Sequence, residues 1–237
     1  MSSGIYVATA GAVAQSTALD ATANNIANAS TAAFHGDRVT FREALAAARS
    51  SDVALVGSGS TKLDSQPGAL TPTDNPLDLA LEGDGYFGVD TAKGPRYTRA
   101  GNFRLDDERK LVTGDGNAVR GEGGGSIAIP EGTQQIAVAA DGSVSADGTV
   151  VGKLELTRFR ATQLKREGGT LFSASGSPET GEPPKVRAGM IEASNVNVVR
   201  GVVDLVKVSR TYESLMRVIQ GYHDVESRAA RELGGGK

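Results

Sequence analysis

Residues 198–219 of the chain read VVRGVVDLVKVSRTYESLMRVI and carry a seven-residue repeat. Its apolar or aromatic members are Val198, Leu205, Tyr212 and Ile219, and a second set falls four residues after the first three: Val202, Ser209 and Met216. This spacing places side chains along one face of an α-helix. We therefore expect a helix from about Val198 to Tyr222 or beyond, with Asn195 or Asn197 as its N-terminal cap.

The N-terminal segment, residues 4–28, repeats this pattern with smaller side chains. Its members at every seventh position are Ile5, Ala12, Leu19 and Ile26, and the poor helix formers Asn24, Asn25 and Asn28 mark its end. Neither helix has an apolar partner close by in the sequence, so the two should pack on each other or on neighbouring molecules. The residues that we expect at this subunit interface are Ile5, Leu19, Ile26, Val198, Val202, Leu205, Tyr212, Leu215 and Ile219.

Between the predicted helices, from about residue 60 to residue 190, the pattern is that of short β-strands. Residues 77–82 alternate apolar and polar side chains until Gly83 ends the run, and later strands are separated by turn sequences such as Asp141–Gly142. The expected fold class is α+β: N- and C-terminal helices pairing as a coiled-coil-like domain, and a β-rich middle domain of short antiparallel strands. We expect the helical domain to be discontinuous, residues 1–45 and 190–237, and the β-rich outer domain to comprise residues 46–189.

The composition excludes several classes of function. The formal net charge is −3, which gives no electrostatic basis for binding nucleic acid. The sequence has no cysteine, so it offers no disulfide, thiolate metal site or cysteine nucleophile. The first residues lack the positive segment of a secretory signal peptide, and no apolar run reaches the roughly 18 residues of a membrane span. We expect no direct membrane insertion and, if the protein is exported, no cleaved signal peptide.

Three sequence features could carry chemistry, and each has a plainer interpretation. Residues 83–88 spell G-x-G-x-x-G, but a dinucleotide site needs a helix to begin there, and Pro95 opposes one. His35 and His223 are the only histidines; they have no metal-ligand spacing, and their places in the terminal segments favour a surface or interface role. The acidic residues 106–108 fit a solvated turn. We therefore expect no catalytic, cofactor-binding or metal-binding residue and no small-molecule substrate.

Several motifs resemble the flagellar basal-body rod and hook family, and they occur in the expected order. They are Asn24–Thr31 followed by Phe34, Leu77–Phe87, Tyr97–Phe103, Leu111–Gly116, Gly189–Asn197 and Arg210–Glu213. The short middle region and the opening residues, Gly4–Ala12, resemble the proximal branch of the rod family more than its longer distal branch. The chain departs from the family at Ala33, where a glycine is common, and at His35, where a basic residue is common.

The resemblance implies a structural subunit of the bacterial flagellar rod that polymerises into the axial drive shaft. Its partners would be copies of itself, other flagellar rod proteins and the flagellar type III export apparatus. The expected location is the basal body, spanning the periplasm, and the expected catalytic activity is none. An alternative from another class is a secreted, monomeric β-rich binding module, and an enzyme ranks third. The heptad repeats at both chain ends favour the polymer, because a monomeric module does not need them.

Overall fold

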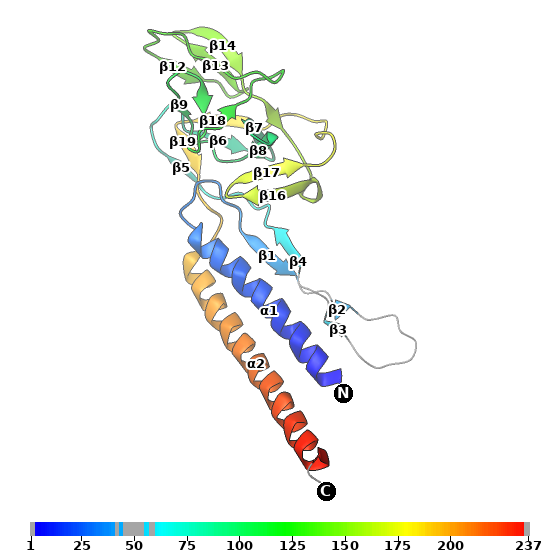
Figure 1. Ribbon diagram of the computed structural model, residues 1–237. Coiled ribbons are helices and arrows are strands. Elements are labelled where there is room, and N and C mark those ends of the chain that lie inside the picture. The colour runs from blue at the N-terminus through cyan, green and yellow to red at the C-terminus, as the bar shows by residue number, and fades with distance from the viewer. Residues whose placement is uncertain (1–2, 41–42, 45–54, 57–59, 235–237) are drawn as a thin grey trace. The chain divides into compact units, whose positions relative to one another are not determined.

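The computed structural model describes residues 3–40, 43–44, 55–56 and 60–234, and the chain forms two compact units (Figure 1). The helical unit comprises Met1–Ala27, Asp37–Asp64 and Asn197–Lys237, and the β unit comprises Asn28–Gly36 and Ser65–Val196. The chain therefore leaves the helical unit at residue 28, returns to it for residues 37–64, and returns again after the β unit is complete.

The helical unit contains the two long helices, α1 (Ser3–Ala27) and α2 (Val198–Gly234), which lie side by side and run antiparallel (Figure 1). A Cβ atom built on Gly11 would lie 3.3 Å from Leu215 Cδ1, and one built on Gly201 would lie 2.9 Å from Ile26 Cγ1. Glycines thus admit large side chains of the opposite helix at both ends of the pair. The predicted pairing of the terminal helices is confirmed.

Helix α2 continues beyond Tyr222, as the sequence pattern allowed, and ends at Gly234. Asn197 caps its start: the Asn197 side chain accepts a hydrogen bond from the Arg200 N–H at 3.0 Å, and the Asn197 carbonyl accepts one from Gly201 at 2.9 Å. Residues 222–233 contain neither glycine nor proline, so nothing in them interrupts the helix once Tyr222 has packed.

A β-hairpin covers another side of α1. Strand β1 (Asp37–Thr40) pairs antiparallel with β4 (Ser60–Leu63), and β2 (Glu43–Ala44) pairs with β3 (Leu55–Val56). Helix α1 contacts both β1 and β3. Its buried side chains are all small: Ala8, Ala12, Ala14, Ala18 and Ala21. Alanines let neighbouring backbones approach α1 closely, which accounts for its thin heptad pattern.

The β unit is built from short antiparallel strands, as predicted. Its strands are β5 (Leu70–Pro72), β6 (Leu79–Glu82), β7 (Tyr86–Thr91), β8 (Gly94–Thr98), β9 (Arg104–Leu105), β10 (Leu111–Val112), β11 (Ala118–Val119), β12 (Ile136–Val138), β13 (Ser143–Ala146), β14 (Thr149–Lys153), β15 (Leu156–Thr157), β16 (Leu164–Gly168), β17 (Leu171–Ala174), β18 (Lys185–Ala188) and β19 (Met190–Glu192). A 3-10 turn, η1 (Ala161–Gln163), precedes β16.

Eight of these strands form the largest sheet, in the order β16-β17-β8-β7-β11-β10-β9, with β15 also paired to β7. Strands β12, β13 and β14 form a second sheet, while β6 pairs with β18 and β5 with β19. The last two pairs join strands from opposite ends of the β unit. Each of these pairs joins an early strand of the β unit to a late one, so the two pairs close the unit.

The core of the β unit lies between these sheets. Phe87 and Val119 are completely buried, and the Phe87 ring meets the Phe103 ring edge-on at 5.1 Å between centroids. The other buried members of this cluster are Leu79, Leu81, Leu111, Ile127, Ile129, Val144, Ala146, Leu154 and Val186. They come from both sheets and from the β6–β18 pair, so a single core stabilises the whole unit.

The glycine-rich sequence at residues 83–88 forms a turn and a strand. Gly83 adopts a φ of +99°, and the chain enters β7 at Tyr86, so the segment is extended where a dinucleotide site would need a helix. The turn approaches its surroundings closely, because a Cβ atom on Gly85 would lie 2.4 Å from Pro184 Cγ. The glycines here serve backbone packing.

The close approach at Gly101 gives a prediction about stability. A Cβ atom there would lie 1.7 Å from the Leu79 carbonyl oxygen, and Gly101 itself accepts a hydrogen bond from the Leu79 N–H at 2.9 Å. Gly101→Ala should lower the free energy of unfolding of the β unit by at least about 2 kcal/mol, because backbone must move to admit the methyl group. Gly125→Ala is the matched control, since it meets open space, and should change stability by less than about 1 kcal/mol. Urea titration measures both, and equal effects would contradict the argument.

Candidate functional site

The face of α2 that packs on α1 follows a heptad repeat. Gly201, Leu215 and Tyr222, which meet α1 at glycine positions of the two helices, differ in position by multiples of seven. They lie three residues after the repeat of Val198, which is one residue before the second set that we expected. Gly201 gave no apolar signal. This seam is therefore set partly by the absence of a side chain.

The structure divides the nine predicted interface residues into two groups. Seven are half-buried in the helical unit: Ile5, Leu19, Ile26, Leu205, Tyr212, Leu215 and Ile219. Val198 and Val202 are 47% and 46% exposed and lie outside the seam between the two helices. A role for any of the nine in contacts between subunits remains a prediction.

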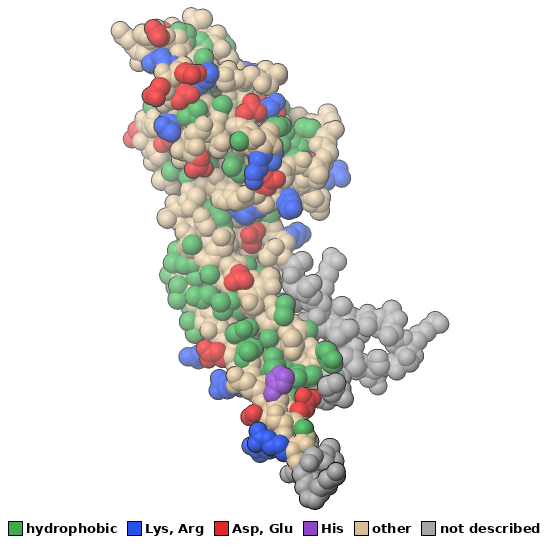
Figure 2. All heavy atoms as spheres, in the orientation of Figure 1, with side chains coloured by type: hydrophobic (Ala, Val, Ile, Leu, Met, Phe, Trp, Pro, Cys, Tyr) green, Lys and Arg blue, Asp and Glu red, His purple; other side chains and the backbone are tan. Residues whose placement is uncertain are grey.

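Helix α2 also has exposed apolar residues that the sequence reading did not single out. Val199, Val203 and Val206 are 77%, 48% and 46% exposed, on a helix whose other side packs on α1. Figure 2 shows hydrophobic side chains gathered along the helical unit. The signal was present in the sequence, because positions 199, 202, 203 and 206 have the i, i+3, i+4, i+7 spacing of one helix face.

In the β unit, a buried carboxylate joins three segments that are far apart in the sequence. His35 Nε2 donates to Glu192 Oε1 at 2.8 Å, Arg99 Nε donates to Glu192 Oε2 at 2.8 Å, and the Gly68 N–H donates to Glu192 Oε1 at 2.9 Å. All three side chains of this cluster are at least 95% buried. A buried charge is tolerated only when it is paired and hydrogen-bonded, and Glu192 meets both conditions.

Arg99 extends this cluster to the glycine-rich turn. Its Nη1 donates to the carbonyls of Gly83 and Gly85 at 3.1 and 3.0 Å, and its Nη2 donates to the Leu81 carbonyl at 3.3 Å. The guanidinium thus fixes backbone oxygens around a tight turn while it neutralises Glu192. The G-x-G sequence therefore has a structural role, as a turn whose carbonyls bind Arg99. It shares the residue spacing of a phosphate-binding loop but not its structure.

The connector, residues 31–36, binds the β unit through its backbone as well. The Ala33 N–H donates to the Glu192 carbonyl at 2.7 Å, and the Asn195 N–H donates to the Phe34 carbonyl at 3.1 Å. Arg166 lies 4.6 Å from the Phe34 ring centroid, a cation–π contact, and also donates to the His35 carbonyl. The segments that enter and leave the β unit are therefore hydrogen-bonded to each other.

The two positions at which the chain departs from the family pattern both lie in this connector. Ala33 has a φ of +52°, in the left-handed region that favours glycine, and this accounts for the glycine common in the family. His35 donates to Glu192, which is a contact that a basic side chain can make. The chain thus keeps the geometry with two different side chains.

Surroundings hold the Glu192 carboxyl in its ionised form. Burial alone would raise the pKa of Glu192, but the hydrogen bond from His35, the charge of Arg99 and the Gly68 N–H outweigh it, and the pKa lies below its usual value. A group with a lowered folded-state pKa stabilises the fold above its unfolded-state pKa. That stabilisation is lost as pH falls through the folded-state value.

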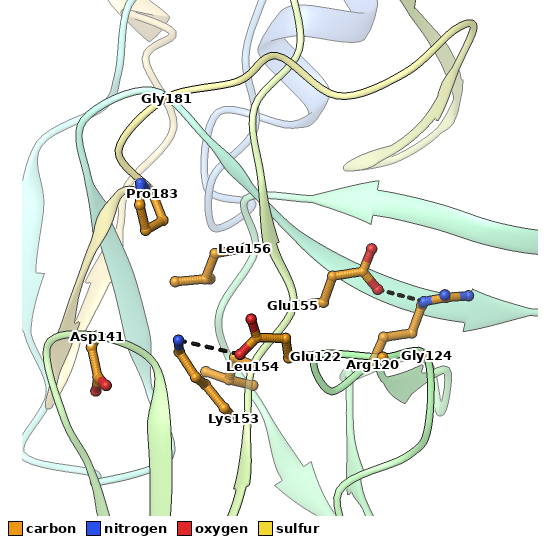
Figure 3. Close-up of a pocket in the computed structure, with 11 residues that line it drawn as sticks. Arg120, Glu122, Gly124, Asp141, Lys153, Leu154, Glu155, Leu156, Gly181 and Pro183 are labelled. Carbon is orange, nitrogen blue, oxygen red and sulfur yellow. Dashed lines mark hydrogen bonds and ion pairs between the residues drawn. The ribbon is translucent and has the colours of Figure 1, made fainter.

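A cavity of about 430 Å³ in the β unit is the other place where charged side chains gather (Figure 3). Arg120 Nε donates to Glu155 Oε2 at 2.6 Å, and Lys153 Nζ lies 3.2 Å from Glu122 Oε2. Asp141 accepts from Ser143 at 2.8 Å. Arg120 and Lys153 each have a carboxylate partner inside the chain, and Asp141 is hydrogen-bonded to Ser143, so the charged side chains of this cavity all make contacts within the chain.

The remaining candidates for chemistry have structural settings. His223 is exposed on α2, and Asp106 accepts a hydrogen bond from the Lys110 N–H at 2.7 Å in a turn, as expected for that acidic run. Among the described residues, no three His, Cys, Asp or Glu side chains are placed to hold a metal ion. Neither helix, over the part that the structure describes, combines the length and the hydropathy of a membrane span.

Comparison with known protein families gives three matches, in chain order. Residues 5–34 match the model described as flagella basal body rod protein, residues 80–146 the flagellar hook protein FlgE/F/G D1 domain, and residues 187–232 the flagellar basal body rod FlgEFG protein C-terminal region. The first and last matches cover most of α1 and α2. The first match also includes Phe34, beside His35, and the last includes Glu192.

Individual relatives align over nearly the whole chain. A flagellar basal-body rod protein FlgF of Rhizobium meliloti (strain 1021) is 30% identical over 100% of both chains. FlgF of Escherichia coli (strain K12) is 34% identical over 90% of each chain. FlgG of Bacillus subtilis (strain 168) is 35% identical over 86% of this chain and 88% of that protein.

The Glu192 cluster predicts a pH-dependent stability. At pH 7, Glu192→Gln should lower the free energy of unfolding of the β unit by roughly 3–5 kcal/mol, because it leaves Arg99 buried without its charged partner. As pH falls through the lowered pKa of Glu192, the wild-type carboxyl itself becomes protonated, so the difference between the two proteins should shrink. Urea titrations at pH 7 and at successively lower pH measure the two curves.

The matched control is Glu82→Gln, which removes a carboxylate that pairs with Arg187 at 2.8 Å on the exposed surface of the same unit. It should cost less than about 1 kcal/mol. A Glu192→Gln variant that loses no more than this control, or loses the same amount at every pH, would show that the buried cluster does not stabilise the unit.

Proposed function

The chain belongs to the flagellar basal-body rod protein family, and from this premise we propose that it is a structural subunit of the bacterial flagellar rod. It polymerises, with copies of itself and with other rod proteins, into the axial drive shaft. The observation that carries the proposal is the pairing of helices from opposite chain ends, with apolar residues of α2 left exposed. A heterologous contact that does not close on itself produces a helical filament.

The proposed division of labour assigns polymerisation to residues 1–45 and 190–237 and the outer surface of the rod to residues 46–189. Two matches to rod-protein models, at residues 5–34 and 187–232, support this assignment because they fall on the terminal segments. The short middle region supports a place in the proximal branch of the family. The alternative, a secreted monomeric β-rich binding module, has no specific observation in its favour.

The nine predicted interface residues contribute to assembly in two ways under this proposal. Seven hold the helix pair in a shape that a neighbouring subunit can bind: Ile5, Leu19, Ile26, Leu205, Tyr212, Leu215 and Ile219. The other two, Val198 and Val202, are exposed and available for direct contact.

The same proposal covers location, export and activity. The subunit works in the basal body, where the rod spans the periplasm, and it reaches that place through the flagellar type III export apparatus without a cleaved signal peptide. It is not an enzyme, and it uses no cofactor, metal, nucleic acid or small-molecule substrate. Family membership and the paired charges of the cavity in Figure 3 support these assignments.

The experiment that tests the proposed function separates assembly from folding. Leu205 is half-buried in the helical unit, so Leu205→Asp places a carboxylate where an apolar side chain packs. Burying a leucine contributes about 1.5–3 kcal/mol, and this is lost together with the seam. Cells carrying Leu205→Asp should lose rod assembly and motility, while the melting transition of the β unit stays unchanged. Motility assays, electron microscopy of basal bodies and calorimetry of the purified protein give the three readouts.

Lys207→Asp is the matched control, because it introduces the same side chain on α2 at a position that is 72% exposed. It should leave assembly largely intact. Normal swimming of the Leu205→Asp cells would refute the proposed role of the helical unit. Loss of the β unit's melting transition would instead mean that α2 belongs to the β core.

A further inference from the structure

The helical unit has two exposed apolar patches at different levels along its axis. The valine stripe consists of Val199, Val202, Val203 and Val206 on α2, and its members are 46–77% exposed. The Tyr6–Val13 patch lies on α1, where these two side chains are 62% and 55% exposed. In each patch the end residues are seven apart, which is about two helical turns. Exposed apolar side chains that gather on one helix face mark sites that another molecule covers.

Helix α1 is unusually poor in charge for a helix with an exposed face. Among its residues, Ser3–Ala27, the one charged side chain is Asp20. A helix that is apolar or uncharged on all sides is normally enclosed by protein. Within the described residues, α2 and the hairpin strands contact α1, yet Tyr6 and Val13 remain exposed. Among the described residues, the face that carries Tyr6 and Val13 is therefore uncovered.

The axial offset between the patches follows from the contacts of the helix pair. Tyr222 lies over Gly4 and Leu215 lies over Gly11, so α1 residues 6 and 13 are level with α2 residues 220 and 213. The valine stripe runs from residue 199 to residue 206. Counted along α2, residues 199 and 206 each lie 14 residues before the positions level with Val13 and Tyr6. The two patches are therefore offset along the helix axis by about 21 Å, at 1.5 Å per residue.

We propose that the valine stripe of one copy packs against the Tyr6–Val13 patch of the next copy, displaced by about 21 Å along the helix axis. This inference rests on the proposed function and names the contact by which the polymer grows. The occupant is a second copy, because the two patches have equal length and both are apolar. Because the contact joins two different patches of copies that are displaced along one axis, it is heterologous, and each copy keeps one free patch for the next.

A lipid surface is a poorer occupant for these patches. Helices that lie on membranes combine an apolar face with a polar face rich in Lys and Arg. Helix α1 has neither residue, and the valine stripe is a run of four short side chains. Binding to lipid is therefore an outcome that the test must be able to reveal and that would contradict the proposal.

Cysteine cross-linking tests the contact directly, because the chain has no cysteine of its own. The full-length double variant Val13→Cys/Val203→Cys is oxidised under conditions in which the wild type polymerises, and products are separated without reductant. A disulfide forms only when the two Cα atoms approach within about 7 Å. We expect a ladder of dimers, trimers and longer products from the double variant and no ladder from either single variant.

The matched control is Val13→Cys/Glu226→Cys, which moves the α2 thiol to an exposed position outside the stripe and away from the level of Val13 in the same copy, and it should give no ladder. Assembly and motility without a ladder from Val13→Cys/Val203→Cys would overturn this contact and leave the proposed function standing. Efficient dimers from a single variant would also overturn it, because they indicate a two-fold contact. Failure of the wild type to polymerise under any condition would refute the proposed function itself.

A second variant protects the test from a folding artefact. Val203 is 48% exposed, so Val203→Asp should leave the melting temperature of the monomer within about 2 °C of wild type while abolishing polymerisation. Ser214→Asp adds the same charge outside the stripe and should polymerise normally. Co-sedimentation of the wild type, but not of Val203→Asp, with anionic phospholipid vesicles, together with normal polymerisation of Val203→Asp, would assign the stripe to a membrane and overturn the proposal.

Discussion

The buried Glu192 carboxylate is the interaction on which the β unit depends most. It lies on β19, near the point where the chain leaves the unit for the last time, and its partners are His35, in the first segment of the unit, and Arg99, at the end of β8. Arg99 in turn holds the carbonyls of the glycine-rich turn before β7. Removing one charge would therefore loosen the first segment, the last segment and a central turn together, since buried ion clusters are costly when incomplete.

The helix pair is stabilised by a different principle, the fitting of large side chains into spaces left by small ones. Gly4, Gly11 and Gly201 stand opposite Tyr222, Leu215 and Ile26. Because glycine is found on both helices, the fit fixes which levels of the two helices face each other. An apolar seam of uniform side chains would allow several alignments of nearly equal energy. The pair therefore has one register, and a polymer built on it has a defined geometry.

The sequence predicted the parts of this architecture that depend on local periodicity. The heptad repeat that contains Leu205 and Tyr212 predicted helix α2, its packing on α1 and the α+β class. A seven-residue apolar repeat is typical of helices that pack along one another. The pattern left the C-terminal end of α2 open, because the helix continues past Tyr222 through residues that contain neither glycine nor proline. The order of the strands in the sheets could not be predicted from the sequence either. Strand β6 pairs with β18 about a hundred residues later, and no local sequence pattern indicates which distant strand will pair.

The Glu192 cluster was equally hidden from sequence reasoning, because its members lie at positions 35, 99 and 192. Each looked ordinary by itself, and His35 was interpreted as a surface or interface residue, whereas the structure buries it at 3% exposure. The departures at Ala33 and His35 were the available signal. They marked a connector in which backbone angle and charge were both constrained, and the positive φ of Ala33 gives the reason for one of them.

The contact between Gly4 and Tyr222 has a kinetic consequence. It joins positions 218 residues apart, nearly the greatest separation that the chain permits. Contacts of such separation bear the largest loop-closure entropy and form late in folding. The β unit can collapse as soon as residue 196 is available, but the helix pair must wait for both ends of the chain. The seam between α1 and α2 is therefore incomplete until the last residues of the chain have folded onto α1, and the apolar surface of the helix pair forms only then.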